Sequence, residues 1–452
     1  MSFDCRSFAN LSRRRFLAGA TVALLPRWAG AAVPRNPDVV VVGAGAAGLG
    51  AARTLLDAGF AVALIEAKDR IGGRAYTETT TFGVPYDVGC HWLDRVPHNP
   101  WLPYARNNGF SVYPARDEEK VYVGDREATK EEYAAHDQAY YDLRGEIYGA
   151  GAAGQDIAAS DAANVTGPWA PLAAAYVGPW SIGKELDGFS CLDWSTAIDG
   201  TDWFCREGFG AVVAHYGRDI PVKLSTPVTR IEWGSKGVSL ETSAGTIAAK
   251  AAIVTASTGL LASGAITFQP ALPADKQESF HRISLGSYNN IALLFSEDIF
   301  GLGEDGYVAY QARTTRAMGL LTNISSSGLS FGYVGGDLGR DLQEAGPAAA
   351  VDFALAELRK IYGSEVDRSF VKGTMSRWSK DPWIRGSYAS AEAGYANLRD
   401  ALRRPLAGRL FFAGEACHET QWATCAGAYL SGVETAQALA EAVGTSAPRA
   451  AD

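Results

Sequence analysis

The stretch that decides the fold is residues 38–48, which read DVVVVGAGAAG. The β-branched run at its start is typical of a buried strand in a parallel sheet. A glycine-rich turn follows at once, and we expect a helix over residues 49–58 that ends at Gly59. A second apolar run, residues 61–65, ends on Glu66. The stretch therefore predicts a strand–turn–helix–strand unit with an acid at the tip of its second strand.

The glycines of this turn have separate physical roles. Gly43 permits a tight turn, Gly45 lets backbone N–H groups approach a pyrophosphate, and Gly48 lets the helix pack closely on the strand. Ala47 belongs to the same predicted cofactor-binding turn, and the helix N-terminus faces the phosphates. Glu66 can accept hydrogen bonds from the hydroxyls of an adenosine ribose, and it would repel a 2′-phosphate. The unit therefore predicts a dinucleotide site that disfavours NADP.

A glycine doublet between two arginines follows the acid, in residues 70–74, which read RIGGR. Gly73 lets the backbone pass close to a cofactor, and Arg74 can offer a planar cationic fork to its pyrophosphate. The pattern resembles the second signature of the flavoproteins with two dinucleotide-binding domains, and the resemblance implies FAD rather than NAD. The alternative interpretations are a purely structural glycine turn and a solvated pair of arginines.

Length and charge narrow the possible functions. The chain has 452 residues, a formal net charge of −9 and 50 glycines. It is too long for one compact core, so we expect two or three domains. The negative charge argues against a nucleic-acid partner and is compatible with a small cationic substrate. Six cysteines show no spacing typical of a metal site, and the five outside residues 1–31 leave at least one free thiol.

The first 31 residues resemble a targeting segment. Residues 12–17, SRRRFL, match the twin-arginine pattern through Arg13 and Arg14, and an apolar run and a small-residue cleavage site follow. We expect a signal peptide over residues 1–31 and export of the folded, cofactor-loaded protein by the twin-arginine machinery into a bacterial periplasm. No apolar run is long enough for a stable membrane anchor. The alternative is a disordered basic N-terminus.

Residues 87–92, which read DVGCHW, carry a closer resemblance. Here the chain is similar to the flavin-containing amine oxidases, the family that includes monoamine and polyamine oxidases. Their pattern is an acid followed by Gly-Ala-x-Trp beneath the flavin, and Cys90 replaces the alanine. L-amino-acid oxidases tend to carry an arginine near this tryptophan. The presence of Trp92 there favours amines without a carboxylate, although Arg95 leaves amino acids open.

The resemblance implies further cofactor contacts late in the chain. A backbone group at Val228 is expected at the adenine, and Glu415 at the ribityl–phosphate region. Thr424 lies at the start of a helix whose N-terminus is expected to face the flavin N1–O2 edge and to stabilise the reduced flavin. Ser387 stands where monoamine oxidases have the cysteine that binds FAD covalently. We therefore expect non-covalent FAD.

The resemblance also implies the substrate residues. Tyr388 is expected as one wall of an aromatic cage over the flavin, with a packed strand tyrosine as the alternative. The second wall of the monoamine oxidases falls near Thr424, and Trp422 is expected either to replace that wall or only to pack. Asn290 occupies a position where many family members have a lysine that binds a water at flavin N5. A neutral residue there predicts slow reaction with O2.

The resemblance covers nearly all of the chain after the signal and implies its architecture. The expected fold is α/β, with a GR2-like, Rossmann-type FAD-binding domain and an interleaved α+β substrate domain. The FAD-binding domain is expected over residues 37–100, 203–262 and 385–443, and the substrate domain over residues 101–202 and 263–384. The match is weakest in residues 101–202, where helical spacing over residues 131–148 is followed by an expected loop over residues 149–167.

The expected reaction is FAD-dependent oxidation of an amine to an imine, which hydrolyses to an aldehyde or ketone. O2 or a periplasmic electron carrier is expected to reoxidise the flavin. Two alternatives stay open. One is a related flavoprotein that oxidises an amino acid or a C–C bond, and the other is a catalytically weakened FAD-binding scaffold. Amine-dependent bleaching of the flavin separates the expected enzyme from the scaffold.

Overall fold

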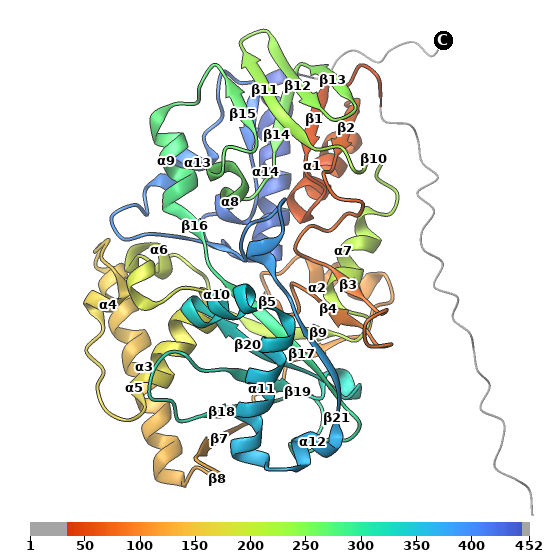
Figure 1. Cartoon of the computed structure of the whole chain (residues 1–452). Helices are drawn as coiled ribbons and strands as arrows, with labels where there is room; N and C mark the ends of the chain where they lie inside the picture. Colours follow the sequence, from red (N-terminus) through yellow and green to blue (C-terminus); the bar gives the residue numbers. More distant parts are fainter. Residues whose placement is uncertain (1–33, 445–452) are drawn as a thin grey trace, which may run out of the picture.

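The computed structural model describes residues 34–444. The expected signal peptide, residues 1–31, lies outside this range. Figure 1 shows an elongated molecule, with the sheet built on the first glycine-rich unit in its upper half and a second sheet in its lower half. Strands from the beginning, middle and end of the sequence share the upper sheet, so the chain passes between the halves several times.

The upper sheet has five parallel strands in the order β10-β2-β1-β14-β23. Their bounds are Val39–Val42 (β1), Val62–Ile65 (β2), Val222–Lys223 (β10), Ala251–Val254 (β14) and Leu410–Phe412 (β23). Strands β1, β2 and β14 are buried along their whole length, which explains their continuous apolar sequences. All five strands come from the three ranges predicted for the FAD-binding domain.

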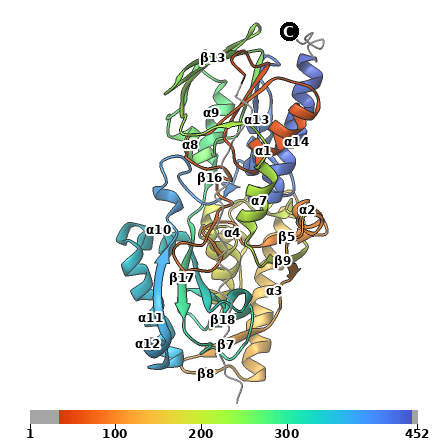
Figure 2. The same cartoon turned by 90° about the vertical axis from the view of Figure 1, so that its right-hand side faces the viewer.

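Two helices far apart in the sequence cover this sheet side by side, as Figure 2 shows: α1 (Ala46–Asp57) and α14 (Cys425–Val443). Their close approach requires small residues, since a Cβ on Gly432 would lie 2.0 Å from the carbonyl oxygen of Ala47. Helix α1 begins at Ala46 rather than at the predicted Leu49, because Gly45 is its N-cap. The strand order and these helices confirm the predicted Rossmann-type unit.

A four-stranded sheet extends the upper half, in the order β13-β12-β11-β15. Its strands are Val228–Gly234 (β11), Gly237–Thr242 (β12), Gly245–Ala249 (β13) and Thr267–Gln269 (β15). Strands β12 and β13 form an antiparallel hairpin.

The lower sheet has seven strands in the order β21-β17-β20-β19-β18-β7-β8. Their bounds are Glu119–Val123 (β7), Arg126–Glu127 (β8), Tyr288–Phe295 (β17), Gly306–Tyr310 (β18), Gly319–Thr322 (β19), Leu329–Gly335 (β20) and Phe370–Met375 (β21). Along β17, Ile291 and Leu293 belong to one apolar cluster and Ala292 to another, so the sheet is buried on both faces.

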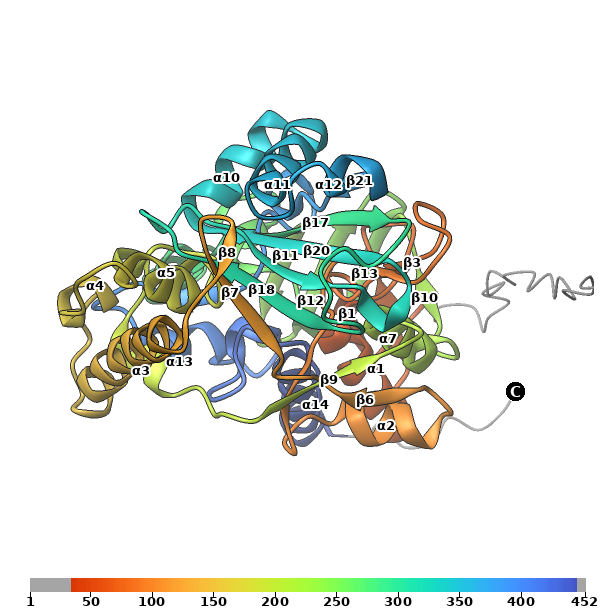
Figure 3. The same ribbon diagram turned by 90° about the horizontal axis from the view of Figure 1, so that it is seen from below.

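Helices cover both faces of the lower sheet (Figure 3). On one side lie α10 (Gly336–Ala345), α11 (Pro347–Tyr362) and α12 (Glu365–Ser369). On the other lie α3 (Lys130–Ala152), α4 (Ala159–Ala162) and α5 (Ala170–Ala175).

The prediction of a loop over residues 149–167 is wrong in part, because α3 continues to Ala152 and α4 forms inside the range. Within this range, the absence of a side chain at Gly151 allows close packing, because a Cβ there would lie 2.1 Å from the carbonyl oxygen of Cys191.

The remaining elements are short and connect the two halves. The strands are Thr77–Glu78 (β3), Tyr86–Asp87 (β4), Leu93–Val96 (β5), Val112–Pro114 (β6), Thr201–Cys205 (β9), Ile283–Leu285 (β16) and Ala389–Ala391 (β22). The helices are Trp101–Asn107 (α2), Cys191–Ser195 (α6), Phe209–Gly217 (α7), Thr258–Ala262 (α8), Ala274–Arg282 (α9) and Leu398–Arg403 (α13). Within residues 34–444, no helix is long and apolar enough to cross a membrane.

Candidate functional site

A cavity of about 1190 Å³ runs from the carboxyl ends of β1 and β2 to the lower sheet. Its walls come from both halves of the molecule and include Glu66 at one end and Tyr333 at the other. The edge where parallel strands end is the usual place for a bound nucleotide in such sheets. The cavity is therefore the candidate site, and it is large enough to hold a dinucleotide and a small substrate together.

The first glycine-rich turn forms one wall of the cavity. Gly43 has a φ of 102°, a conformation that favours glycine. A Cβ on Gly48 would lie 1.8 Å from the carbonyl oxygen of Gly43, so this position must lack a side chain for α1 to pack on β1. Gly43, Gly45 and Ala47 line the cavity, whereas Gly48 lies behind that wall. These placements agree with the turn, the open wall and the close helix packing that the sequence predicts for these residues.

The second glycine pair lies directly against the first. Gly45 and Gly72 form a parallel bridge, and a Cβ on Gly73 would lie 3.2 Å from the Cα of Gly45. Gly45 and Gly73 both line the cavity. Two loops without side chains therefore meet where the sequence predicts a pyrophosphate.

Glu66 lies at the end of β2 with its carboxylate facing the cavity. It accepts hydrogen bonds from the backbone N–H groups of Ala44, at 2.7 Å, and Lys68, at 2.8 Å. Burial raises the pKa of Glu66, and the two N–H groups oppose that shift by stabilising the charged form. The carboxylate is held in place at the end where the ribose is expected. Val228 lines the same region.

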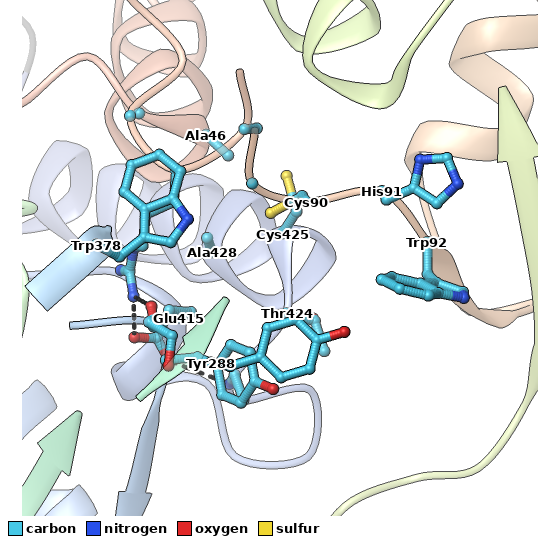
Figure 4. Close-up of a pocket in the computed structure, with 18 of the residues that line it drawn as sticks. Ala46, Cys90, His91, Trp92, Tyr288, Trp378, Glu415, Thr424, Cys425 and Ala428 are labelled. Atoms are coloured by element: carbon cyan, nitrogen blue, oxygen red, sulfur yellow. Dashed lines mark hydrogen bonds and ion pairs between the residues drawn. The ribbon is translucent and has the colours of Figure 1, made fainter. Parts of the chain in front are cut away.

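Arg74 and Glu415 come from opposite ends of the sequence and both line the cavity, where Figure 4 shows Glu415. The Arg74 guanidinium donates to Glu415 Oε1, at 3.0 Å, and to the carbonyl oxygen of Ser387. Glu415 Oε2 accepts from the N–H groups of Ala389, at 3.2 Å, and Ala423, at 3.1 Å. Arg74 is the predicted pyrophosphate contact and Glu415 the predicted ribityl–phosphate contact. The ion pair therefore places these two predicted contacts next to each other on the cavity wall.

The N-terminus of α14 opens onto the cavity next to this pair. Thr424 caps the helix, with its hydroxyl accepting from the Gly427 N–H at 2.8 Å and donating to the carbonyl of Gln421 at 2.8 Å. Thr424, Cys425 and Ala428 all line the cavity. The helix N-terminus therefore places its partial positive charge at the site, as predicted.

Two tyrosines form the aromatic part of the site. Tyr388 lies beside Tyr288, with ring centroids 5.7 Å apart and planes inclined at 39°, and both line the cavity. Sequence reasoning predicted Tyr388 and missed Tyr288. The signal was present, because Tyr288 lies two residues before Asn290 on one strand, and alternation puts both side chains on the same face.

Asn290 is buried at the wall of the cavity with 2% of its surface exposed. Its backbone N–H donates to the hydroxyl of Ser376 at 3.0 Å. Among the described residues, nothing donates a hydrogen bond to its buried Oδ1 atom. Such an orphaned acceptor calls for a bound group or a water. Together with the two glycine loops, it shows that the residues present fit a bound dinucleotide cofactor.

Trp422 is not part of the cavity wall. The side chain is 1% exposed, and its indole N–H donates to the hydroxyl of Thr196 at 3.0 Å. It lies outside the set of described residues that line the cavity. Two roles were considered for Trp422, a wall of the aromatic cage or packing. The structure shows packing, because Trp422 belongs to an apolar cluster that includes residues of α3, α5 and β20.

Carboxyl groups gather on the cavity wall of the lower half. Glu119 accepts a hydrogen bond from the Tyr176 hydroxyl, and burial raises its pKa. Burial also raises the pKa of Asp94 to about 6. Asp202 belongs to an exposed part of β9, and its partial loss of solvent at the cavity wall, together with the nearby Asp94 carboxylate, raises its pKa to about 7. Sequence reasoning missed all three acids, which come from β7, β5 and β9 and carry no local motif.

Arg95 lies among these acids and also lines the cavity. Its guanidinium donates to the carbonyl oxygens of Thr420, at 3.0 Å, and Trp422, at 3.4 Å. Asp94 and Asp202 act on its charge as well. Arg95 and the neighbouring Arg116, which also lines the cavity, therefore offset part of the negative charge that these acids carry when ionised.

Comparison with known proteins places these features in context. The family model described as flavin containing amine oxidoreductase matches residues 46–186 and 169–440. Polyamine oxidase 2 of Arabidopsis thaliana is 28% identical over 440 residues, which cover 89% of this chain and 88% of that protein.

Solved structures show the same fold at lower sequence identity. A double mutant of putrescine oxidase superposes with a TM-score of 0.78 and 20% identity, over 90% of this chain and 99% of that one. Cyclohexylamine oxidase from Brevibacterium oxydans IH-35A has a TM-score of 0.75 and 21% identity, over 90% of this chain and 99% of that one. The arrangement of the two halves is thus shared with both structures.

Proposed function

The chain belongs to the flavin-containing amine oxidoreductase family, whose members oxidise amines with FAD, and we propose that its substrate is an aliphatic amine with a second positive charge. A diamine or a polyamine has this character. The observation that carries the proposal is one cavity with the Tyr288–Tyr388 pair on one wall and Glu119, Asp94 and Asp202 on others.

The residues that would hold FAD are those that line the upper part of the cavity. The loops at Gly43, Gly45 and Gly73 leave room for the pyrophosphate, and Glu66 faces the ribose position. Arg74 and the N-terminus of α14 supply positive charge. When bound, FAD supplies the two-electron acceptor that converts an amine to an imine, which water then hydrolyses.

The tyrosine pair orients the reacting end of the substrate. Ring faces attract a cationic or partly charged amine nitrogen, and two rings inclined at 39° limit its directions of approach. Asn290 lies on the strand that carries Tyr288, with an acceptor oxygen that has no partner among residues 34–444. That oxygen can hold a water close to the reacting carbon.

The carboxyl groups recognise the second charge. Glu119 and Asp202 line the same cavity as the tyrosines, and their ionised forms attract a distant ammonium group. Arg95 cannot serve as a free carboxylate clamp, because two carbonyl oxygens and the neighbouring aspartates already engage it. The site therefore favours a dication over an amino acid. The names of polyamine oxidase 2 and putrescine oxidase support the same substrate class.

Anaerobic flavin reduction across a matched panel tests the proposal. The panel contains butane-1,4-diamine, butylamine of the same chain length, cyclohexylamine and an amino acid. We expect the diamine to bleach the flavin with the highest second-order rate constant. Equal or faster reduction by butylamine or cyclohexylamine would overturn the dication assignment. Bleaching by the amino acid would favour a related flavoprotein that oxidises amino acids. The absence of bleaching with every amine would favour a catalytically weakened FAD-binding scaffold.

Two further parts of the proposal concern the cell and the electron acceptor. The Arg13–Arg14 pair before a short apolar run supports export by the twin-arginine route to the periplasm. The neutral Asn290 supports an electron carrier, rather than O2, as the preferred acceptor. Slow reoxidation would then be a property of the site, because no positive charge at this position stabilises developing superoxide.

A further inference from the structure

Two cysteine thiols meet at the cofactor end of the cavity. Cys90 follows β4, and Cys425 is the first residue of α14. Figure 4 shows their sulfur atoms next to each other, and the neighbouring Cys90 thiol raises the pKa of Cys425. Both residues line the cavity. The roles assigned to the site above use neither thiol.

The backbone on each side holds the two thiols face to face. The Cys90 N–H donates to the carbonyl oxygen of Arg74 at 3.1 Å. A Cβ on Gly89 would lie 1.8 Å from that same oxygen, so the chain before Cys90 is fixed by close packing. The carbonyl of Cys425 accepts from the Trp101 indole N–H at 3.3 Å. The thiol pair therefore results from the fold and not from a local motif.

The two thiols differ in their surroundings. The neighbouring Cys90 thiol and burial both raise the pKa of Cys425, so this thiol stays protonated at neutral pH. Cys90 is half-buried and is the more accessible of the two from the cavity. Other cysteines have separate partners, since the thiol of Cys191 contacts the carbonyl of Ala158 and that of Cys205 contacts Glu207.

We propose that Cys90 and Cys425 form a reversible disulfide when the protein meets hydrogen peroxide. The Cys90 sulfur attacks one peroxide oxygen and the O–O bond breaks. Water is released, and Cys90 becomes a sulfenic acid. The Cys425 sulfur then attacks the Cys90 sulfur, the S–O bond breaks, and a second water leaves. In sum, two thiols lose two protons and two electrons, and one peroxide takes up both and becomes two waters.

The disulfide would tie the segment after β4 to the N-terminus of α14. That helix end lies at the cofactor part of the cavity, next to Thr424. Oxidation therefore alters the surface beneath the cofactor without touching the tyrosine pair. Peroxide arises from any turnover with O2 and from aerobic surroundings, so the pairing does not depend on the substrate proposed above.

Peptide mapping of the purified holoprotein tests the pairing. The protein is treated with hydrogen peroxide, quenched, alkylated under denaturing conditions and digested. We expect two alkylatable thiols to be lost, a linked Cys90–Cys425 peptide to appear, and dithiothreitol to restore both thiols. The flavin absorbance should shift with oxidation and return on reduction. Oxidation of Cys90 to a sulfinic acid with no linked peptide would overturn the proposal.

Two variants sharpen the test. In Cys425→Ala the partner thiol is missing, so peroxide should drive Cys90 to irreversible oxidation and dithiothreitol should no longer restore it. In Cys191→Ala, which alters a buried cysteine outside the cavity, the linked peptide should form as in the native protein. Linkage of Cys90 to another cysteine, or no loss of thiols in the native protein, would contradict the assignment even if Cys425→Ala failed to fold.

Discussion

Tyr288 and Tyr388 lie beside each other with ring centroids 5.7 Å apart, although β17 and the segment before β22 bring them from different parts of the chain. Both rings line the cavity, and burial raises the pKa of each, so both hydroxyls stay neutral. The sequence predicts Tyr388 as one wall of an aromatic cage and considers Trp422 for the second wall, whereas the structure places Tyr288 beside Tyr388.

Replacing either ring should weaken amine oxidation. For Tyr388→Leu and Tyr288→Leu we expect kcat/KM to fall by roughly 3- to 30-fold, because a cation–π contact contributes about 0.5–2 kcal/mol. Tyr388→Phe keeps the ring and should lose less. Steady-state kinetics with FAD-replete protein measures the effect. A packed strand tyrosine would instead lower stability and leave kcat/KM of the folded fraction unchanged.

Gly48→Ala should abolish FAD binding or folding. A Cβ at Gly48 would lie 1.8 Å from the Gly43 carbonyl oxygen, so α1 would have to move away from β1. Gly145→Ala is the matched control, because its Cβ would meet no atom within 4 Å on the exposed side of α3. That change should be neutral or stabilise by up to about 1 kcal/mol. Flavin content and thermal unfolding compare the two variants, and a flavin-replete Gly48→Ala would contradict the packing argument.

Asn290→Lys should raise the rate of flavin reoxidation by O2 relative to the rate of reduction by amine. A positive charge at this position stabilises developing superoxide, whereas the native amide is neutral. Asn290→Leu, which is also uncharged at neutral pH, serves as the control and should not raise that ratio. Stopped-flow mixing of pre-reduced protein with O2 measures it. Fast reoxidation of the native protein, unchanged by lysine, would make it an ordinary oxidase.

The preference for a diamine over a monoamine should increase with pH between about 5 and 8. The pKa values of Asp94 and Asp202 are raised to about 6 and about 7, so both carboxyls are neutral below this range and charged above it. Attraction of the distant ammonium is therefore lost as pH falls. The ratio of kcat/KM for the two substrates cancels the ionisation of the reacting amine.

Asp202→Asn should flatten this pH dependence and lower the ratio at pH 8 by roughly 5-fold, from an ion pair of about 1 kcal/mol. Asp199→Asn is the control, because Asp199 does not line the cavity and its carboxylate is already paired with Arg144 at 2.7 Å. A ratio independent of pH in the native protein would remove Asp94 and Asp202 from substrate recognition.

Replacing Arg13 and Arg14 with lysine should hold the FAD-loaded protein in the cytoplasm of a bacterial host. The twin-arginine route reads this pair and exports folded proteins, which suits a chain that takes up a dinucleotide before export. Fractionation and flavin-dependent activity in each compartment measure the outcome. Periplasmic activity that stays at the native level would show that residues 1–31 have another role.

The sequence by itself determined the cofactor half of this protein. Residues 38–48 and 70–74 are each one continuous stretch, and Gly48 acts on the carbonyl oxygen of Gly43, only five residues earlier in the same stretch. Strand β1, helix α1 and the acid Glu66 therefore lie where the pattern predicts them. Burial on both faces leaves an uninterrupted apolar run in β1, which the sequence displays directly.

Only the tertiary structure decided the substrate half. Glu119, Asp94 and Asp202 lie on three separate strands, and Cys90 meets Cys425 only because β4 ends beside α14. The sequence left two roles open for Trp422, and the structure shows that it packs in the apolar core of the lower half and does not line the cavity. Such contacts join residues far apart in the chain, so no local spacing records them. They exist because the two apolar cores must be buried together, which brings side chains from distant strands to the walls of one cavity.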